Sequence, residues 1–168
     1  MKIKVSLIIT MLMVQSFEIK AQITDKNYSV MLQDLLVHNV PEISVKEFSE
    51  SKLKSLILDS RSKKEFEVSK IKNAIWVGFS PSNLSMITSL PKNTPIVIYC
   101  SVGYRSEKVT EKLIENGFTN VKNLYGGIFE WVNEENLIVD QKNNKTDKIH
   151  PFNNDWGKWL TKGIKSFK

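Results

Sequence analysis

The sequence predicts an α/β fold: an open, mostly parallel sheet with helices on both faces. Two observations indicate this fold. Short apolar runs that are typical of buried strands alternate with segments whose apolar residues recur at helical spacing. The strongest run, PIVIYC at 95–100, is rich in β-branched residues, and a helical pattern follows it directly. A body of about 120 residues is long enough for one domain with a single core.

The expected elements alternate along the chain. Compact apolar runs bounded by polar residues predict strands at 55–59, 74–79, 95–100 and 121–124. Helical spacing, or a capping box such as SVKE or SKKE, predicts helices over 28–40, 82–90 and 105–116 and helix starts at 44 and 62. Gly117 stands where the C-terminal cap of a helix favours glycine.

The N-terminus has the pattern of a secretory signal peptide. Lys2 and Lys4 precede an apolar run of ten residues, which is too short to span a bilayer but fits the central region of such a signal. Uncharged residues near Ala21 predict cleavage after that residue. We therefore expect a signal peptide over 1–21 and an exported protein, periplasmic or secreted. An uncleaved membrane anchor is the alternative.

The charge is distributed unevenly over the chain. Residues 22–140 carry 14 basic and 15 acidic side chains, whereas residues 141–168 carry seven lysines and two aspartates. A near-neutral body argues against a nucleic-acid-binding domain, which would spread basic residues over a folded face. The polar stretch 141–148 has few apolar residues and predicts a linker. We expect one domain at 22–140, followed by a basic linker and tail at 141–168.

The tail combines lysines with large apolar residues. At helical spacing, its apolar residues share one face: Trp156, Trp159, Leu160 and Ile164. This pattern indicates either a terminal element that packs against the domain or a basic amphipathic segment. An amphipathic segment would contact an anionic membrane surface or an acidic protein partner.

Cys100 is the only cysteine of the chain, and it ends the strongest predicted strand. In open α/β sheets, ligands bind at the carboxyl ends of the strands. Gly103 allows the next loop to turn successive N–H groups inward as an anion-binding nest. The following helix N-terminus and Arg105 add positive charge. Because all of these features favour the thiolate, we predict a reactive cysteine rather than an inert buried one.

Four segments of the chain resemble the rhodanese-like domains, which are single-domain sulfurtransferases of α/β fold. CSVGYRS at 100–106 is similar to the active-site loop of that family. LILDSRSKKEF at 56–66 is similar to its early strand and helix, with Asp59, Arg61 and the pair Glu65–Phe66. IKNAI and LYGGIFEW fit the segment after that helix and the closing glycine pair with its tryptophan. The resemblance covers roughly residues 38–138.

The resemblance implies transfer of a sulfane sulfur through a persulfide on Cys100. The donor would be thiosulfate or a persulfide, and the acceptor a thiol or cyanide, with no metal or organic cofactor. The loop residues expected to bind the substrate are Ser101, Val102, Gly103, Tyr104, Arg105 and Ser106. Asp59 and Arg61 are expected to support the site as an ion pair or a hydrogen-bond network near its mouth, and Phe66 and Trp131 to lie in the core.

Two other functions remain open. A non-catalytic rhodanese-type module would only bind partners. A cysteine-dependent phosphatase or arsenate reductase would resemble C-x5-R, whereas here four residues separate Cys100 from Arg105. The shorter loop fits a single sulfur better than a tetrahedral oxyanion. His38 and His150 lack the neighbouring residues of a metal site or of a Cys–His protease, so we expect both at the surface. We also expect a monomer, and we expect no binding of nucleic acid.

Overall fold

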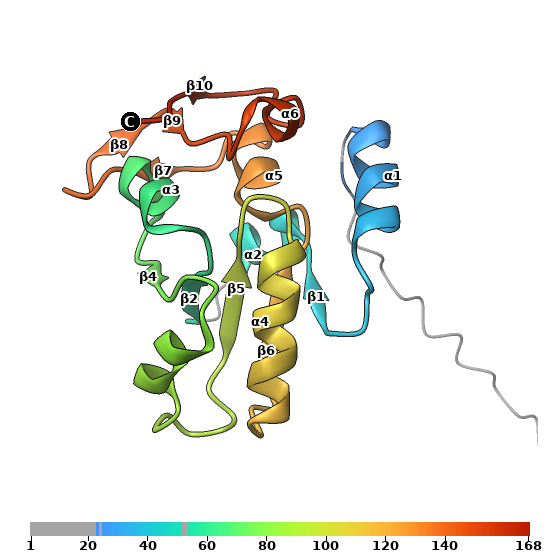
Figure 1. Ribbon diagram of the computed structural model, residues 1–168, viewed down its shortest axis with the longest axis vertical. Helices are drawn as coiled ribbons and strands as arrows, with labels where there is room; N and C mark the ends of the chain where they lie inside the picture. The colour runs from blue at the N-terminus through green and yellow to red at the C-terminus, as the bar shows by residue number, and fades with distance from the viewer. Residues whose placement is uncertain (1–22, 24, 52–53) are drawn as a thin grey trace, which may run out of the picture.

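The computed structural model describes residues 23, 25–51 and 54–168 (Figure 1). The signal peptide predicted at 1–21 lies outside the described residues. Within those described ranges, no helix combines the length and the apolar character needed to cross a bilayer.

In the described part of the chain, a five-stranded sheet of order β1-β6-β5-β2-β4 forms the centre. Every pair of neighbours in it is parallel, which confirms the predicted open parallel sheet. Its strands are β1 (Glu42–Ile43), β2 (Leu56–Asp59), β4 (Ile75–Trp76), β5 (Ile96–Tyr99) and β6 (Val121–Leu124). The strongest predicted strand, β5, occupies the middle of the sheet.

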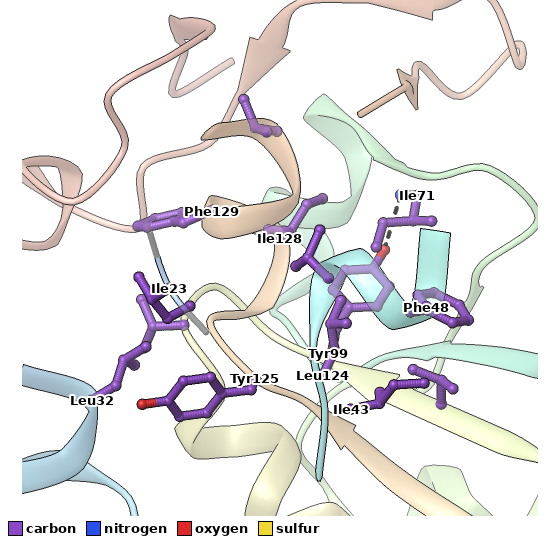
Figure 2. Packing of buried hydrophobic residues seen from close by; sticks show 14 of the residues in the cluster. Ile23, Leu32, Ile43, Phe48, Ile71, Tyr99, Leu124, Tyr125, Ile128 and Phe129 are labelled. Carbon is purple, nitrogen blue, oxygen red and sulfur yellow. Dashed lines mark hydrogen bonds between the residues drawn. The ribbon is translucent and has the colours of Figure 1, made fainter. Parts of the chain in front are cut away.

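Helices cover both faces of this sheet, as predicted. The helices of the described residues are α1 (Lys26–Leu35), α2 (Val45–Glu50), α3 (Lys63–Val68), the 3-10 helix η1 (Pro81–Ile87), α4 (Tyr104–Glu115), α5 (Gly127–Asn133) and α6 (Asn154–Gly157). Val97 and Tyr99 of β5 pack in the cluster that α1, α2 and α5 complete, part of which Figure 2 shows. Ile96 and Ile98 pack with η1 and α4. Because successive side chains of a strand point to opposite faces, β5 is buried on both sides.

Both predicted capping boxes are present. The Ser44 hydroxyl accepts from the Glu47 N–H at 3.1 Å, and the Glu47 carboxylate accepts from the Ser44 N–H at 3.1 Å. Ser62 and Glu65 make the same reciprocal pair at the start of α3. Local sequence therefore sets where these two helices begin.

Helix α1 ends earlier than predicted. The helical pattern extends to residue 40, but α1 stops at Leu35. The N–H groups of Val37 and His38 donate instead to the Glu107 carboxylate of α4, at 3.2 and 2.8 Å. The acceptor lies far along the chain, so helical spacing alone could not indicate this end.

The stretch predicted as a linker is part of the folded body. Strand β7 (Ile138–Val139) pairs antiparallel with β3 (Lys70–Ile71) and with β8 (Lys145–Thr146). The intervening polar residues form a turn in which the Asp140 carboxylate accepts from the N–H groups of Lys142 and Asn144, at 2.8 and 2.9 Å. Polar residues that suggested a linker thus close a turn between two strands.

The tail packs against the domain, which is the first of the two expected arrangements. It does not form one amphipathic helix, because α6 is short and β10 (Ile164–Lys165) pairs with β9 (Lys148–Ile149). Leu160 is buried in the core, and the Trp159 ring stacks on Tyr28 of α1 at 5.5 Å. Ile164, expected on the same face, is exposed. In Figure 1 the tail, in red, runs across the end of the molecule that carries α5.

Candidate active site

Cys100 lies directly after β5, and its side chain is almost completely buried. Its Sγ accepts a hydrogen bond from the Gly103 backbone N–H at 3.1 Å. Gly103 is the N-cap of α4 with φ 119°, and no side chain of the described residues caps this helix. The sulfur therefore lies at a helix N-terminus whose first N–H groups have no intrahelical acceptor and whose dipole favours negative charge.

Two backbone N–H groups at the N-terminus of α5 donate hydrogen bonds to the cysteine loop. The Ile128 N–H donates to the Cys100 carbonyl at 2.9 Å, and the Phe129 N–H donates to the Ser101 carbonyl at 3.0 Å. Gly127 makes this approach possible, with φ 58°. A Cβ at Gly127 would lie 2.5 Å from the Cys100 carbonyl oxygen. Only glycine fits this position without displacing the loop.

Arg105 forms a two-pronged ion pair with Glu65 of α3. Its Nη1 donates to Oε2 at 2.9 Å and its Nη2 to Oε1 at 2.7 Å. The Ser101 hydroxyl accepts from Arg105 at 3.0 Å and donates to Glu65 at 2.8 Å. Three side chains thus form one closed network beside the cysteine.

Both partners of this network stay charged at neutral pH. Burial acts to raise the pKa of Glu65, but the hydrogen bond and charge of Arg105, with the hydroxyls of Ser62 and Ser101, lower it to about 2. Burial acts to lower the pKa of Arg105, and its hydrogen bond to Glu65 and the charge of Cys100 raise it. The positive charge of Arg105 is therefore balanced by an adjacent carboxylate.

Asp59 and Arg61 form a second, fully buried ion pair, with Nη2 and Oδ2 at 2.6 Å. Arg61 Nη2 also donates to the Ser69 carbonyl at 2.6 Å, and the guanidinium lies 5.5 Å from the centre of the Tyr99 ring. Burial acts to lower the pKa of Arg61, but the charge of Asp59 raises it. The expected ion pair is thus present, and Arg61 ties β2 to the chain after α3.

A cavity of about 370 Å³ lies over the cysteine. Its lining residues come from the loop, from α1 and from the tail: Leu35, Cys100, Ser101, Val102, Tyr104, Arg105, Phe152 and Trp156. The floor of the cavity is the cysteine loop, and Leu35, Phe152 and Trp156 form its walls. We call these three side chains the apolar wall.

Phe152 is held in a left-handed turn, with φ 65°. Its N–H donates to Nδ1 of His150 at 3.1 Å, and its ring lies 5.1 Å from the Arg105 guanidinium. His150 was expected at the surface, but only 8% of it is exposed. Burial lowers the pKa of His150; the charge of Glu65 opposes this shift, and nearby cations add to it. The neutral ring thus supplies the acceptor that fixes the turn.

A comparison of the sequence with models of protein families shows to which family the chain belongs. The model of the rhodanese-like domain matches residues 44–134. The chain belongs to the rhodanese-like domain family. This match begins at α2 and includes β2, β4, β5, β6, the cysteine loop and α5. It confirms the resemblance seen in the sequence.

Curated relatives share the rhodanese-like part of much longer proteins. The adenylyltransferase and sulfurtransferase UBA4 of Debaryomyces hansenii is 33% identical over 95 residues, which are 52% of this chain and 21% of that protein. The tRNA uridine(34) hydroxylase of Hamiltonella defensa is 37% identical over 84 residues, or 46% of this chain and 23% of that protein. The chain spans about a fifth of the length of these relatives.

Solved structures share the rhodanese-like fold. A rhodanese-related protein from Thermoplasma volcanium has a TM-score of 0.53 and 26% identity, covering 59% of this chain and 97% of that one. The thiosulfate sulfurtransferase from Pseudomonas aeruginosa has a TM-score of 0.53 and 17% identity, covering 79% of this chain and 26% of that one. At that identity the second similarity shows the fold alone.

The structure brings together most of the predicted substrate-binding residues of this rhodanese-like domain. Four of them line the cavity beside Cys100: Ser101, Val102, Tyr104 and Arg105. Gly103 supplies the N–H that reaches the sulfur. Ser106 is fully buried, and its hydroxyl donates to the Gly103 carbonyl at 3.0 Å, so it stabilises the loop from within.

Sequence reasoning missed Glu65 as a site residue and missed the whole apolar wall. Glu65 carried a capping-box signal, which indicates a helix start and not a partner for Arg105. Trp156 was part of the apolar pattern of the tail, but that pattern does not show which surface it covers. Within the described residues, no cluster of three or more histidine, cysteine, aspartate or glutamate side chains could hold a metal ion.

Proposed function

We propose that the protein is a sulfurtransferase that carries a sulfane sulfur on Cys100. The observation that carries this proposal is the position of Cys100 Sγ, which accepts the Gly103 N–H at 3.1 Å at the start of α4 and lines the cavity. A helix N-terminus favours negative charge beside it, and the cavity gives a donor a route to the sulfur. The names of the curated relatives include both a sulfurtransferase and a hydroxylase, so the geometry carries the proposal more than the names do.

In the first step, the Cys100 thiolate attacks the outer sulfur of the donor. A bond forms between Sγ and that sulfur, and the sulfur–sulfur bond of the donor breaks. The leaving group departs with the electron pair, as sulfite from thiosulfate or as a thiolate from an organic persulfide. Covalent catalysis of this kind needs an activated nucleophile and a place for the intermediate.

In the second step, an acceptor thiolate or cyanide attacks the outer sulfur of the Cys100 persulfide. Sγ leaves with the electron pair and returns to the thiolate, which the Gly103 N–H and the N-terminus of α4 stabilise. No net oxidation or reduction takes place, and the cycle consumes no cofactor. The outer sulfur of the intermediate would extend into the cavity that Cys100 lines.

The test is intact-mass measurement of the purified protein after brief exposure to thiosulfate, inorganic polysulfide or glutathione persulfide. We expect a gain of one sulfur atom that cyanide removes and that Cys100→Ser does not acquire. A folded protein with a free thiol that gains no sulfur from any of these donors would contradict the proposal. A non-catalytic binding module would then be the better interpretation.

The predicted signal peptide suggests where this reaction takes place. We propose that the protein acts after export, with residues 1–21 removed. The support is the sequence pattern of Lys2, Lys4 and the apolar run that follows them. N-terminal sequencing of the protein recovered from the periplasm or the medium is expected to begin at Gln22. Recovery of the full chain from the cytoplasm would contradict this location.

A further inference from the structure

The apolar wall comes entirely from outside the region that matches the rhodanese-like domain. That region spans residues 44–134, whereas Leu35 belongs to α1 and Phe152 and Trp156 belong to the tail. The floor of the cavity is thus built from the matched region, and these walls from segments that lie outside it. Segments that close over a reactive sulfur are suited to choosing its substrate.

Several contacts hold these two segments beside the loop. The Tyr28 hydroxyl of α1 donates to the Gly126 carbonyl at 2.8 Å, next to the turn that supports Cys100. The Trp159 ring of the tail stacks on the Tyr28 ring at 5.5 Å, so α1 and the tail contact each other. The side-chain amide of Asn133 donates to the Trp159 carbonyl at 2.9 Å. The apolar wall is therefore in place before a ligand arrives.

The charge inside the cavity does not favour a small dianion. Among the described residues that line it, Arg105 is the only cation, and Glu65 binds that guanidinium through both nitrogens. Thiosulfate carries two negative charges, and its oxygens would face the apolar wall without a free cation. An unpaired anion loses its hydration there and gains little in return.

The size of the cavity also favours a donor with a carbon group. Its volume of about 370 Å³ falls in the range of small-molecule sites, and an inorganic ion would leave most of it empty. A second hollow of about 460 Å³ adjoins it along α1 and shares Leu35 and Trp156. The second hollow is lined by Val30, Met31 and the carboxylate of Asp34, which repels anions.

We propose that the apolar wall selects organic persulfides whose carbon group is apolar or aromatic, and that it disfavours thiosulfate and persulfides with charged carbon groups. This inference rests on the proposed sulfur transfer. Any charge of such a donor sits at its sulfur end, which enters the N–H groups around Cys100. Its carbon group lies against Leu35, Phe152 and Trp156, where burial of apolar area stabilises it.

In this step one S–S bond forms and one S–S bond breaks. The Cys100 thiolate forms a bond to the outer sulfur of R–S–SH, the S–S bond breaks, and R–S⁻ leaves with the electron pair. The products are Cys100–S–SH and the free thiolate of the donor. The apolar wall touches only the R group, so it changes selection among donors rather than the bonds that form.

The test compares donors with the same reacting bond. Benzyl persulfide and glutathione persulfide both present a primary carbon next to the S–S unit, but only the benzyl group is uncharged and aromatic. Sulfur loading of Cys100 is followed by intact mass at equal donor concentrations, with thiosulfate and inorganic polysulfide alongside. We expect benzyl persulfide to load at least tenfold faster than either glutathione persulfide or thiosulfate.

Variants of the apolar wall give the second part of the test. Trp156→Ala and Phe152→Ala are each expected to lower the benzyl-to-glutathione ratio about tenfold, and Trp156→Phe to retain part of the preference. Phe79→Ala is the matched control, since Phe79 and Phe152 are 45% and 44% exposed and each lies beside a cation. Phe79 lines neither hollow, so its variant is expected to keep the ratio.

The outcomes separate the two proposals. If no donor loads Cys100, including inorganic polysulfide, the proposed function fails. If polysulfide loads Cys100 but benzyl persulfide is no faster than glutathione persulfide or thiosulfate, sulfur transfer stands and the selection by the apolar wall is overturned. An equal loss of the ratio in Phe79→Ala would also overturn it, because the effect would not belong to the cavity.

Discussion

The floor and the apolar wall of the cavity over Cys100 are built in opposite ways. The floor is one continuous segment, residues 100–106, which runs from the end of β5 into the first turn of α4 and accepts backbone hydrogen bonds from α4 and α5. The wall combines Leu35 with two tail residues, Phe152 and Trp156. Leu35 lies more than a hundred residues before both of them in the chain. The floor supplies N–H groups and the sulfur, whereas the wall supplies apolar surface.

Under the proposed sulfur transfer, this difference separates the chemistry of the site from its selectivity. A change in the floor alters the position of the sulfur or its stabilisation, and it affects every donor. A change in the wall alters only the fit of the carbon group. Four predictions test this difference, and the largest expected effect comes first.

The largest effect is expected from Gly127→Ala, because its new side chain would collide with the backbone of the cysteine loop. The new Cβ would lie 2.5 Å from the Cys100 carbonyl oxygen and 2.6 Å from that of Ser101. We expect a loss of about 3 kcal/mol or more in the free energy of unfolding and a loss of sulfur loading with all donors. Urea unfolding and intact mass measure the two effects.

Gly117→Ala is the matched control for this variant. Gly117 also has a positive φ, 87°, but the nearest atom to its Cβ would be Lys92 Cδ at 4.0 Å. Its cost should be limited to backbone strain of about 1–2 kcal/mol, with sulfur loading retained. Equal losses in the two variants would show that the close approach at Gly127 does not hold the loop.

An intermediate effect is expected from Glu65→Gln, which removes the charge that balances Arg105. We expect a loss of about 2 kcal/mol of stability and a several-fold rise in loading by thiosulfate relative to benzyl persulfide. Glu67→Gln, at an exposed position of the same helix, is the control and should change stability by about 0.5 kcal/mol or less. An unchanged donor ratio in Glu65→Gln would contradict the role of charge balance.

The same carboxylate sets a pH dependence. The pKa of Glu65 is lowered from 4.5 to about 2 in the folded protein, so the unfolded chain binds the proton first as pH falls. Its contribution, about 3 kcal/mol at most, is fully present above pH 4.5 and is lost between about pH 4.5 and 2. Urea unfolding of the native protein and Glu65→Gln should therefore converge over that pH range.

The smallest effect is expected from His150, which holds part of the wall. Burial lowers its pKa from 6.5, so its contribution is present above pH 6.5 and is lost as pH falls below that value. A protonated Nδ1 no longer accepts from the Phe152 N–H. Thermal unfolding at pH 7.5 and 5.5 should show a loss of about 1 kcal/mol that His150→Asn lacks. The same loss in His150→Asn would assign it to another group.

The parts of the molecule that local sequence predicted are those whose cause is local. The two capping boxes and the buried strand β5 follow from residues within a few positions of one another. The cysteine loop followed in the same way, because strand, glycine and helix start are consecutive. The ion pair of Asp59 and Arg61 was also expected, and these residues are two positions apart.

The parts that sequence reasoning missed depend on distant partners. Helix α1 ends at Leu35 because the chain after it donates to Glu107. The tail does not form a single helix, because β10 pairs with β9 and the Leu160 side chain is buried in the core. Glu65 pairs with Arg105 across 40 positions of the chain.

The sequence by itself determined the α/β sheet, the end of the central strand and the position of Cys100 just before a helix start. Those features depend on side-chain periodicity and on turns, which act within a few residues. The tertiary structure alone decided that Arg105 is balanced by Glu65 and that α1 and the tail enclose Cys100. The reason is physical: such contacts join segments far apart in the chain, and only packing against one core brings them together.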